Sequence, residues 1–114
     1  MEAEILAFCR ALAGIKEKIG LTKTTEQTWR SFWWQDKLVL AMEQKTPLRL
    51  ELRCERNLQK KLQEEYESVM QSRVLGKNGV EIILSGQLNE AEIKDLVRHA
   101  YEMTKLMVEK ERLL

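Results

Sequence analysis

The residue types that most often carry catalysis are scarce in this chain. His99 is the only histidine among the 114 residues. It stands beside the apolar stripe of an expected helix, where a surface histidine is a more ordinary interpretation than a general base. No Ser/His/Asp or Cys/His set falls at a spacing that would assemble a nucleophile with its base. The sequence therefore predicts a protein that is not an enzyme and has no catalytic residue.

The sequence does not indicate a metal or cofactor site either. The chain has no CxxC motif and a single histidine, which disfavours zinc. The acidic residues Glu2, Glu4 and Glu17 near the N-terminus are too sparse for a hard cation. The GKNG motif at 76–79 lacks the spacing and the Ser/Thr of a phosphate-binding loop, so a turn is expected there. We expect no cofactor and no metal.

Cys9 and Cys54 both stand among apolar residues at positions typical of a core. Two free, buried thiols in a reducing compartment are expected, and a disulfide between them or a reactive thiol is the alternative. The opening MEAEILAFCRALAG is acidic before its apolar residues, unlike a signal peptide. No apolar run approaches the roughly 18 residues that a spanning helix needs. We therefore expect a cytoplasmic protein without membrane contact.

Basic side chains in the middle of the chain are the candidates for binding nucleic acid. Residues 28–80 hold ten Lys/Arg against seven Asp/Glu, although the net charge of the whole chain is +1. Arg73 and Lys77 lie on an expected hairpin and are predicted to project outward, while Arg49 and Arg53 lie on the polar face of an expected strand. These four cations predict weak, non-specific and salt-sensitive contacts to DNA phosphates. A solvated strand face without a ligand is the alternative.

Trp33 and Trp34 are neighbours in an expected strand, so their side chains must point to opposite faces of a sheet. One can lie in the core, and the other lies on the wet face, under a helix or against a partner. An exposed tryptophan can stack on a base or dock a protein. A protein-interaction module that uses Trp33 and Trp34 is therefore our alternative function, against the interpretation that both are covered.

These candidates must be positioned by a single α+β domain over residues 1–114, because half this length would bury too small a core. An N-terminal helix is expected to end at Gly14 or Gly20, with Lys16 and Lys18 in its last turn. LTKTTEQ is expected to be a loop, and TWRSFWWQ and KLVLAMEQ to form a β-hairpin. PLRLELRC predicts a half-buried strand with its leucines inside and Arg49, Glu51 and Arg53 facing water.

The second half of the chain predicts a helix, a hairpin and a final helix. ERNLQKKLQEEYESVM reads as a surface helix, and RVLGKNGVEIIL as a hairpin with its turn at 77–79 and Gly79 serving that turn. In the last helix, Asn89 and Glu92 form a capping box, and Met107 extends the buried stripe. The sheet is expected to be antiparallel, with the N- and C-terminal helices packed on it. The predicted core comprises Phe8, Leu50, Leu52, Ile82, Ile93, Leu96 and Val97.

Several short segments of this sequence resemble the MmcQ/YjbR family. They are FCRALAG, KLVLAM, LELRCER and LSGQLNEAEIKDLVRHAYEM, and together they extend over nearly the whole chain. The resemblance implies an antiparallel sheet with helices packed on it, similar to the frataxin-like architecture. It also implies DNA binding through a double wing, as described for some members. The family's Leu-Asn-Lys word followed by His-Trp is represented here only by Lys77, so the role of that histidine and tryptophan is not carried over.

Overall fold

Within residues 1–21 and 28–113, nine elements follow one another in the order helix, four strands, helix, two strands and helix. The computed structural model describes residues 1–21 and 28–113. Most of the expected loop LTKTTEQ, residues 22–27, lies outside the described residues. The elements are α1 (Glu2–Arg10), β1 (Ile15–Ile19), β2 (Trp29–Trp34), β3 (Lys37–Glu43), β4 (Arg49–Arg53), α2 (Arg56–Glu65), β5 (Val69–Ser72), β6 (Gly76–Ile83) and α3 (Glu90–Leu113).

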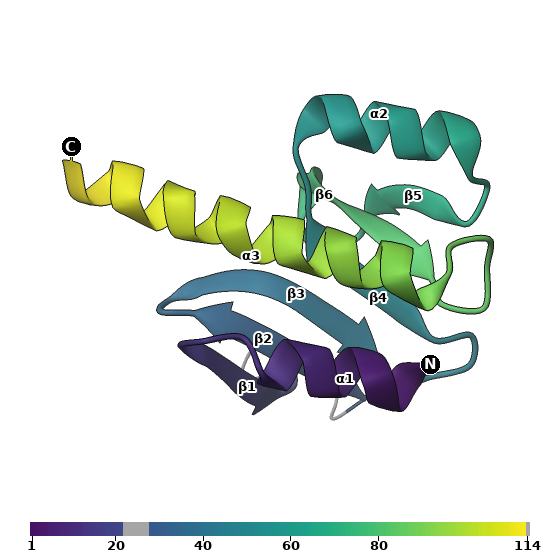
Figure 1. Cartoon of the computed structure of the whole chain (residues 1–114), viewed down its shortest axis with the longest axis horizontal. Coiled ribbons are helices and arrows are strands. Elements are labelled where there is room, and N and C mark those ends of the chain that lie inside the picture. The colour runs from purple at the N-terminus through teal and green to yellow at the C-terminus, as the bar shows by residue number, and fades with distance from the viewer. Residues whose placement is uncertain (22–27, 114) are drawn as a thin grey trace.

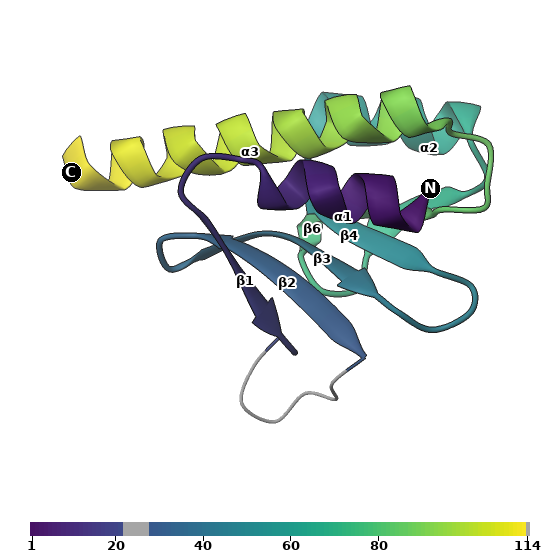
Figure 2. The same cartoon turned by 60° about the horizontal axis from the view of Figure 1, so that its bottom comes forward.

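The six strands form one sheet in the order β1-β2-β3-β4-β6-β5. Every neighbouring pair is antiparallel. Figures 1 and 2 show the three helices on one face of this sheet, with α3 running across its centre, α1 beside it, and α2 over β5 and β6. The predicted α+β class, the antiparallel sheet and the β2–β3 hairpin are confirmed.

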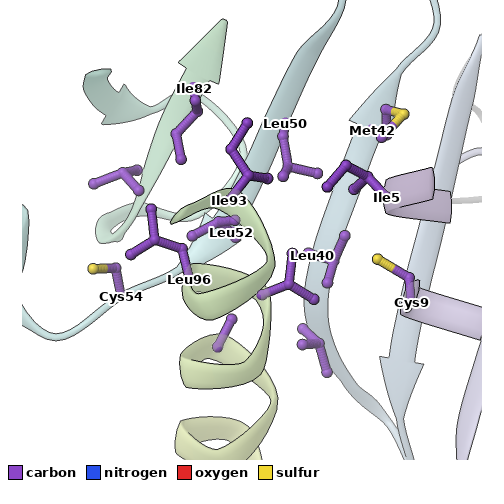
Figure 3. Packing of buried hydrophobic residues seen from close by; sticks show 14 of the residues in the cluster. Ile5, Cys9, Leu40, Met42, Leu50, Leu52, Cys54, Ile82, Ile93 and Leu96 are labelled. Carbon is purple, nitrogen blue, oxygen red and sulfur yellow. The ribbon is translucent and has the colours of Figure 1, made fainter. Parts of the chain in front are cut away.

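One apolar cluster fills the space between the sheet and the helices (Figure 3). Leu50 and Leu52 of β4 and Ile82 of β6 meet Ile93 of α3 there, and all four side chains are fully buried. Leu96 and Val97 are buried in the same cluster, as predicted. The remaining predicted core residue, Phe8, lies at the margin of the cluster, where it is partly buried.

The final helix begins where its capping box predicts. The Glu92 backbone N–H donates to Asn89 Oδ1 at 2.8 Å, and the Asn89 backbone N–H donates to Glu92 Oε1 at 3.0 Å. Farther along α3, the Tyr101 hydroxyl donates to the carbonyl of Ala13 at 2.6 Å and so ties the helix to the chain between α1 and β1. Met107, predicted to be buried, is only partly covered, because the buried stripe of α3 continues through Thr104 and Val108 instead; the last turns of the helix project past the other elements (Figure 1).

The prediction that the first helix continues to Gly14 or Gly20 is wrong. The helix ends at Arg10, and IKEKI forms β1, with Ile15 opposite Trp34 and Ile19 opposite Arg30. Gly14 makes the turn between them at φ +78°, a conformation that side chains disfavour. Lys16 and Lys18 therefore belong to an edge strand.

The second helix is also shorter than predicted. It ends at Glu65, Tyr66 is already extended at φ −130° and ψ 118°, and Val69 belongs to β5. The apolar stripe of the helix is thin, and Leu62 is the last of its residues buried in the core. The spacing from Leu62 to Val69 is compatible with a continued helix, and it is equally compatible with a turn followed by an edge strand.

The turn of the last hairpin lies before its predicted position. It comprises residues 73–75, so Lys77 and Asn78 lie within β6 instead of at a tip. Gly76, which follows the turn, has φ +58°. Gly79 does not serve the turn, because it lies opposite Arg53 inside the ladder between β4 and β6.

Cys9 and Cys54 are free and buried. Burial raises the pKa of the Cys9 thiol to about 12 and that of the Cys54 thiol to about 11. Neutral thiols are therefore favoured at both positions, which suits packing more than reactivity. Among the described residues, no helix is long and apolar enough to cross a membrane.

Candidate functional site

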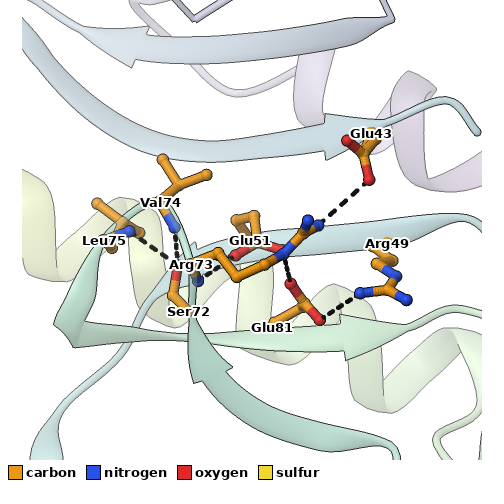
Figure 4. Close-up of polar contacts among 8 residues, drawn as sticks. All are labelled: Glu43, Arg49, Glu51, Ser72, Arg73, Val74, Leu75 and Glu81. Atoms are coloured by element: carbon orange, nitrogen blue, oxygen red, sulfur yellow. Dashed lines mark hydrogen bonds and ion pairs between the residues drawn. The ribbon is translucent and has the colours of Figure 1, made fainter.

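Most of the polar face of β4 does not face water, so that prediction is wrong for Glu51 and Arg53, while Arg49 is 30% exposed. Glu51 is fully buried and Arg53 is 8% exposed. The chain between β5 and β6 folds back over this face of the sheet, on the side opposite the helices (Figure 4). We call residues 73–75 the strap, because they cross the sheet at the level of Glu51.

Carboxylates from three strands gather beneath the strap and bind two of the four predicted cations. Glu43 of β3, Glu51 of β4 and Glu81 of β6 form this group, which we call the carboxylate cluster. Arg49 donates to Glu81 at 3.0 Å. Arg73 forms a short hydrogen bond with Glu81 and donates to Glu43 at 3.2 Å (Figure 4). The Arg73 side chain is 51% exposed, which agrees with its predicted outward position, but its guanidinium is not free because carboxylates of two strands hold it.

The third predicted cation, Arg53, also has a structural partner. Its Nε and Nη2 atoms donate to the carbonyl of Leu38 at 3.0 and 2.8 Å. The bulge between Phe32 and Trp33 shifts the register of β2 against β3. This irregularity lies beside Leu38, whose carbonyl accepts from an arginine side chain. Arg53 therefore stabilises a sheet irregularity from a nearly buried position.

Glu51 and Glu81 lie directly opposite each other in the pairing of β4 with β6. Burial and a hydrogen bond with Glu81 raise the pKa of Glu51 to about 7. Burial also raises the pKa of Glu81, but hydrogen bonds from Glu51 and Arg73 outweigh it, so that this pKa lies below its usual value. One carboxyl group of the pair thus favours the neutral form and the other the ionised form.

Lys77, the fourth predicted cation, lies in a different place. It lines a groove of about 190 Å³ between α2 and the β5–β6 hairpin, together with two further cations, Arg56 and Lys60. Three amide side chains, those of Gln59, Gln63 and Gln71, complete the lining. We call this site the basic groove. Its lining residues carry three positive charges and no negative charge.

Gln59 fixes the two walls of the basic groove relative to each other. Its side chain is 7% exposed, and its Nε2 donates to the carbonyls of Cys54 at 2.7 Å and Lys77 at 3.0 Å. Helix α2 is thereby hydrogen-bonded to β6 at the residue that carries the groove's third cation. The i, i+4 spacing of Arg56 and Lys60 indicates one helix face, but their proximity to Lys77 depends on how α2 packs.

The two tryptophans point to opposite faces, as predicted, and both are partly covered. Trp34 lies against Tyr101 of α3, with the ring centroids 5.7 Å apart and the planes at 88°. Trp33 lies on the other face, where its indole N–H donates to Ser31 Oγ at 2.9 Å and the Lys18 ammonium stands 4.8 Å from its ring centroid. Helix α3 thus packs on the Trp34 face of the sheet, and Trp33 lies on the opposite face.

The histidine of the chain, His99, has a hydrogen-bond partner in the backbone. The His99 Nε2 atom accepts the backbone N–H of Glu55 at 3.2 Å, so this histidine stabilises the start of α2. No group of three or more His, Cys, Asp or Glu side chains within residues 1–21 and 28–113 is arranged to hold a metal ion. The basic groove and the carboxylate cluster are thus the two polar sites that we consider in the described part of the fold.

Comparison of the fold with solved structures places it among compact α+β domains. The Deinococcus radiodurans protein DR2400, with a domain described as DUF419, matches at TM-score 0.74 and 18% identity over 89% of this chain and 75% of that chain. A protein from Pseudomonas syringae matches at TM-score 0.74 and 14% identity, over 91% of this chain and 98% of that chain. No protein-family model and no curated protein matches the sequence. These likenesses show a shared fold.

Proposed function

We propose that this chain is a non-enzymatic, cytoplasmic domain of the MmcQ/YjbR type that binds DNA weakly and without sequence preference through the basic groove. The observation that carries the proposal is the grouping of Arg56, Lys60 and Lys77 around one hollow. None of the three has an ion-pair partner among the described residues. An unpaired cation can exchange its counterions for a phosphate at little cost.

The fold agrees with the family part of this proposal. DUF419, the description of the DR2400 domain, is a YjbR/MmcQ-like family. The same family is the one that the words FCRALAG, KLVLAM and LELRCER resemble. The resemblance of short sequence segments and the similarity of the fold therefore favour the same family. Fold alone does not specify activity, so the binding site is argued from the charges.

The basic groove is a better DNA surface than the strand face that the sequence suggests. On the strand face, Arg49 and Arg73 are matched by the three acidic side chains of the carboxylate cluster. A phosphate approaching there would have to displace hydrogen-bonded carboxylates, while the arginines would lose partners that they already have. Of the four predicted cations, Lys77 alone belongs to the proposed interface, and Arg56 and Lys60 join it.

The groove's chemistry suits the sugar–phosphate backbone instead of base edges. Lysine acts as a point charge, arginine can donate two parallel hydrogen bonds to one phosphate, and glutamine amides donate to neutral oxygens. Phosphate contacts position a protein on DNA but carry no sequence information directly. Three cations would give a slope of log Kd against log salt of roughly 3, at about 0.9 for each phosphate contact.

A salt titration of paired charge-neutralised variants tests the proposal. We expect the parent to bind labelled duplex DNA in fluorescence anisotropy at about 50 mM salt and to lose most binding by about 200 mM. Lys60→Gln/Lys77→Gln should weaken binding and lower the salt slope by about 2. The control Lys16→Gln/Lys110→Gln removes the same charge from exposed positions outside the groove and should keep the parent slope.

Two results would contradict DNA binding at the groove. One is a parent protein that binds no duplex at about 50 mM salt, where phosphate contacts are strong. The other is a control variant that loses as much affinity as the groove variant, because net charge alone would then explain the effect. Circular dichroism and urea unfolding of each variant separate lost contacts from lost folding.

A protein-interaction module remains the alternative proposal. Trp33 supports it, because this residue is only partly buried and lies on the face opposite Trp34, which packs against α3. Apolar docking on this ring would change little with salt, whereas phosphate binding weakens steeply. Salt dependence of any partner found for the full chain therefore distinguishes the two functions.

A further inference from the structure

The backbone of the strap is held to the sheet by one buried side chain, that of Glu51, while the Arg73 side chain adds contacts with Glu81 and Glu43. Glu51 Oε1 accepts from the Ser72 hydroxyl at 2.9 Å and from the Arg73 backbone N–H at 3.0 Å. Ser72 Oγ in turn accepts the backbone N–H groups of Val74 at 3.2 Å and Leu75 at 2.8 Å (Figure 4). All three strap N–H groups thus depend, directly or through Ser72, on one oxygen of Glu51.

The other oxygen of Glu51 lacks the hydrogen-bond donors that an ionised carboxylate needs in a buried site. Glu51 Oε2 is buried and has no conventional hydrogen-bond partner, and the nearest cation atom, Arg73 Nη2, is 3.9 Å away. Its neighbour is the Glu81 carboxylate, and two carboxylate oxygens attract only when one carries a proton. A neutral Glu51 resolves this: Oε1 accepts both strap bonds and Oε2–H donates to Glu81.

We propose that Glu51 is a proton-controlled anchor for the strap, which is closed on the sheet while this carboxyl is neutral and opens when the proton is lost. The pKa of Glu51, raised to about 7, supports the proposal. Because the closed state binds the proton more tightly than the open state, closure is fully favoured below the ordinary carboxyl pKa. It loses this contribution as the pH rises through about 7.

The charges around Glu51 explain why the proton matters. Glu81 faces it from β6 and Glu43 lies nearby on β3, while Arg49 of its own strand and Arg73 of the strap supply the positive charge. Arg53, also on β4, is occupied by the Leu38 carbonyl. Ionised Glu51 makes three carboxylates share two guanidiniums at a buried site. Opening the strap hydrates an ionised Glu51 and so removes the cost of burying its charge, which is the largest cause of its raised pKa.

Opening would uncover a part of the sheet that no helix protects. A β-carbon on Gly79 would lie 2.8 Å from Leu75 Cδ1 and 2.5 Å from the Leu52 carbonyl oxygen, which is too close for a side chain. Leu75 of the strap therefore lies directly over the β4–β6 ladder at Gly79. The movement is confined to residues 73–75, because β5 and β6 keep their own pairing from Val69 to Ser72. The anchor is independent of the proposed DNA binding and can be measured without any ligand.

Amide hydrogen exchange of the free protein tests the anchor. Between pH 6 and pH 8, after correction for intrinsic exchange, we expect the protection of the Arg73, Val74 and Leu75 amides to fall about tenfold. The Val97 amide in α3 reports the core and should fall less. Glu51→Gln keeps the accepting oxygen and replaces the acid proton with an N–H, so its strap protection should not change with pH.

A second glutamate variant serves as the control for the loss of a carboxylate. Glu64→Gln, at an exposed position of α2, should reproduce the parent's pH dependence. Equal strap protection at pH 6 and pH 8, or an equal loss at Val97, would overturn the proposal. If Glu51→Gln does not fold, carboxyl carbon chemical shifts of the parent decide the matter. Titration of Glu51 in the ordinary carboxyl range would then refute the anchor.

Discussion

Glycine is favoured at two positions of the β5–β6 hairpin for different structural reasons. Gly76 has φ +58° and nothing within 4 Å of the place where a β-carbon would stand. Only its backbone conformation favours glycine, and asparagine also tolerates that region. Gly79 has a strand conformation but stands against the Leu52 carbonyl, 2.5 Å from its β-carbon position. Its role is close approach of two strands and the strap.

Gly79→Ala should therefore be the more harmful of two substitutions in this hairpin. We expect it to lower the free energy of unfolding by about 1–3 kcal/mol, because the backbone of β4 must move to admit a methyl group. Gly76→Asn should cost less than about 1 kcal/mol, since asparagine accepts the left-handed conformation and has open space there. Urea unfolding measures both. The reverse ranking would contradict the close approach of Gly79 to the Leu52 carbonyl.

At the scale of elements, α3 has a defined start that the chain encodes locally. Asn89 and Glu92 satisfy each other's backbone N–H groups, and Glu90 and Glu92 place negative charge at the positive end of the helix dipole. The helix has 24 residues, and its first turns supply Ile93, Leu96 and Val97 to the core. The cap therefore stabilises the part of α3 that packs.

Removing the cap should have a measurable and reversible effect. Asn89→Ala loses the side-chain acceptor for the Glu92 N–H and should lower the free energy of unfolding by about 1 kcal/mol. Asn89→Asp and Asn89→Ser keep an acceptor and should remain within about 0.5 kcal/mol of the parent. Thermal and urea unfolding provide the measurement. An alanine variant as stable as the parent would mean that α3 starts without help from its capping box.

The whole molecule depends on one core between the sheet and its helices. Leu96 and Leu106 show the two environments that α3 meets, because Leu96 is 8% exposed and Leu106 is 57% exposed. Leu106 lies between the buried residues Thr104 and Val108 and so faces away from the sheet, while Figure 1 shows the last turns of α3 projecting past the other elements. The same residue type on the same helix thus has different consequences for stability.

A matched pair of leucine truncations measures this difference. We expect Leu96→Ala to lower the free energy of unfolding by about 2–5 kcal/mol, through lost burial and the cavity left behind. Leu106→Ala should change it by less than about 0.5 kcal/mol, because its side chain is mostly in water. Equal effects would show either that α3 is rotated or that its C-terminal half is covered in solution, and sedimentation of the parent would distinguish these cases.

Local patterns in the amino-acid sequence determine much of this fold. Alternation in LRLEL places Leu50 and Leu52 inside, and the helical stripe after Asn89 places Ile93, Leu96 and Val97 opposite them. These features depend on neighbours within a few residues, and their periods differ for strands and helices. The antiparallel α+β arrangement could be predicted for that reason. The ends of α1 and α2 could not, because the residues beyond them, IKEKI and Val69, become strands only by pairing with the sheet.

The partners of the charged side chains are decided only by the tertiary structure. Glu43, Glu51, Arg73 and Glu81 come from three strands and the strap, which meet when the strap folds over the sheet, and no local period records that meeting. The sequence therefore identifies the basic residues but cannot separate Arg73, which carboxylates hold, from Lys77, which lines the basic groove. Charge–charge energies depend on distance and burial, and both quantities are set by long-range pairing of the strands.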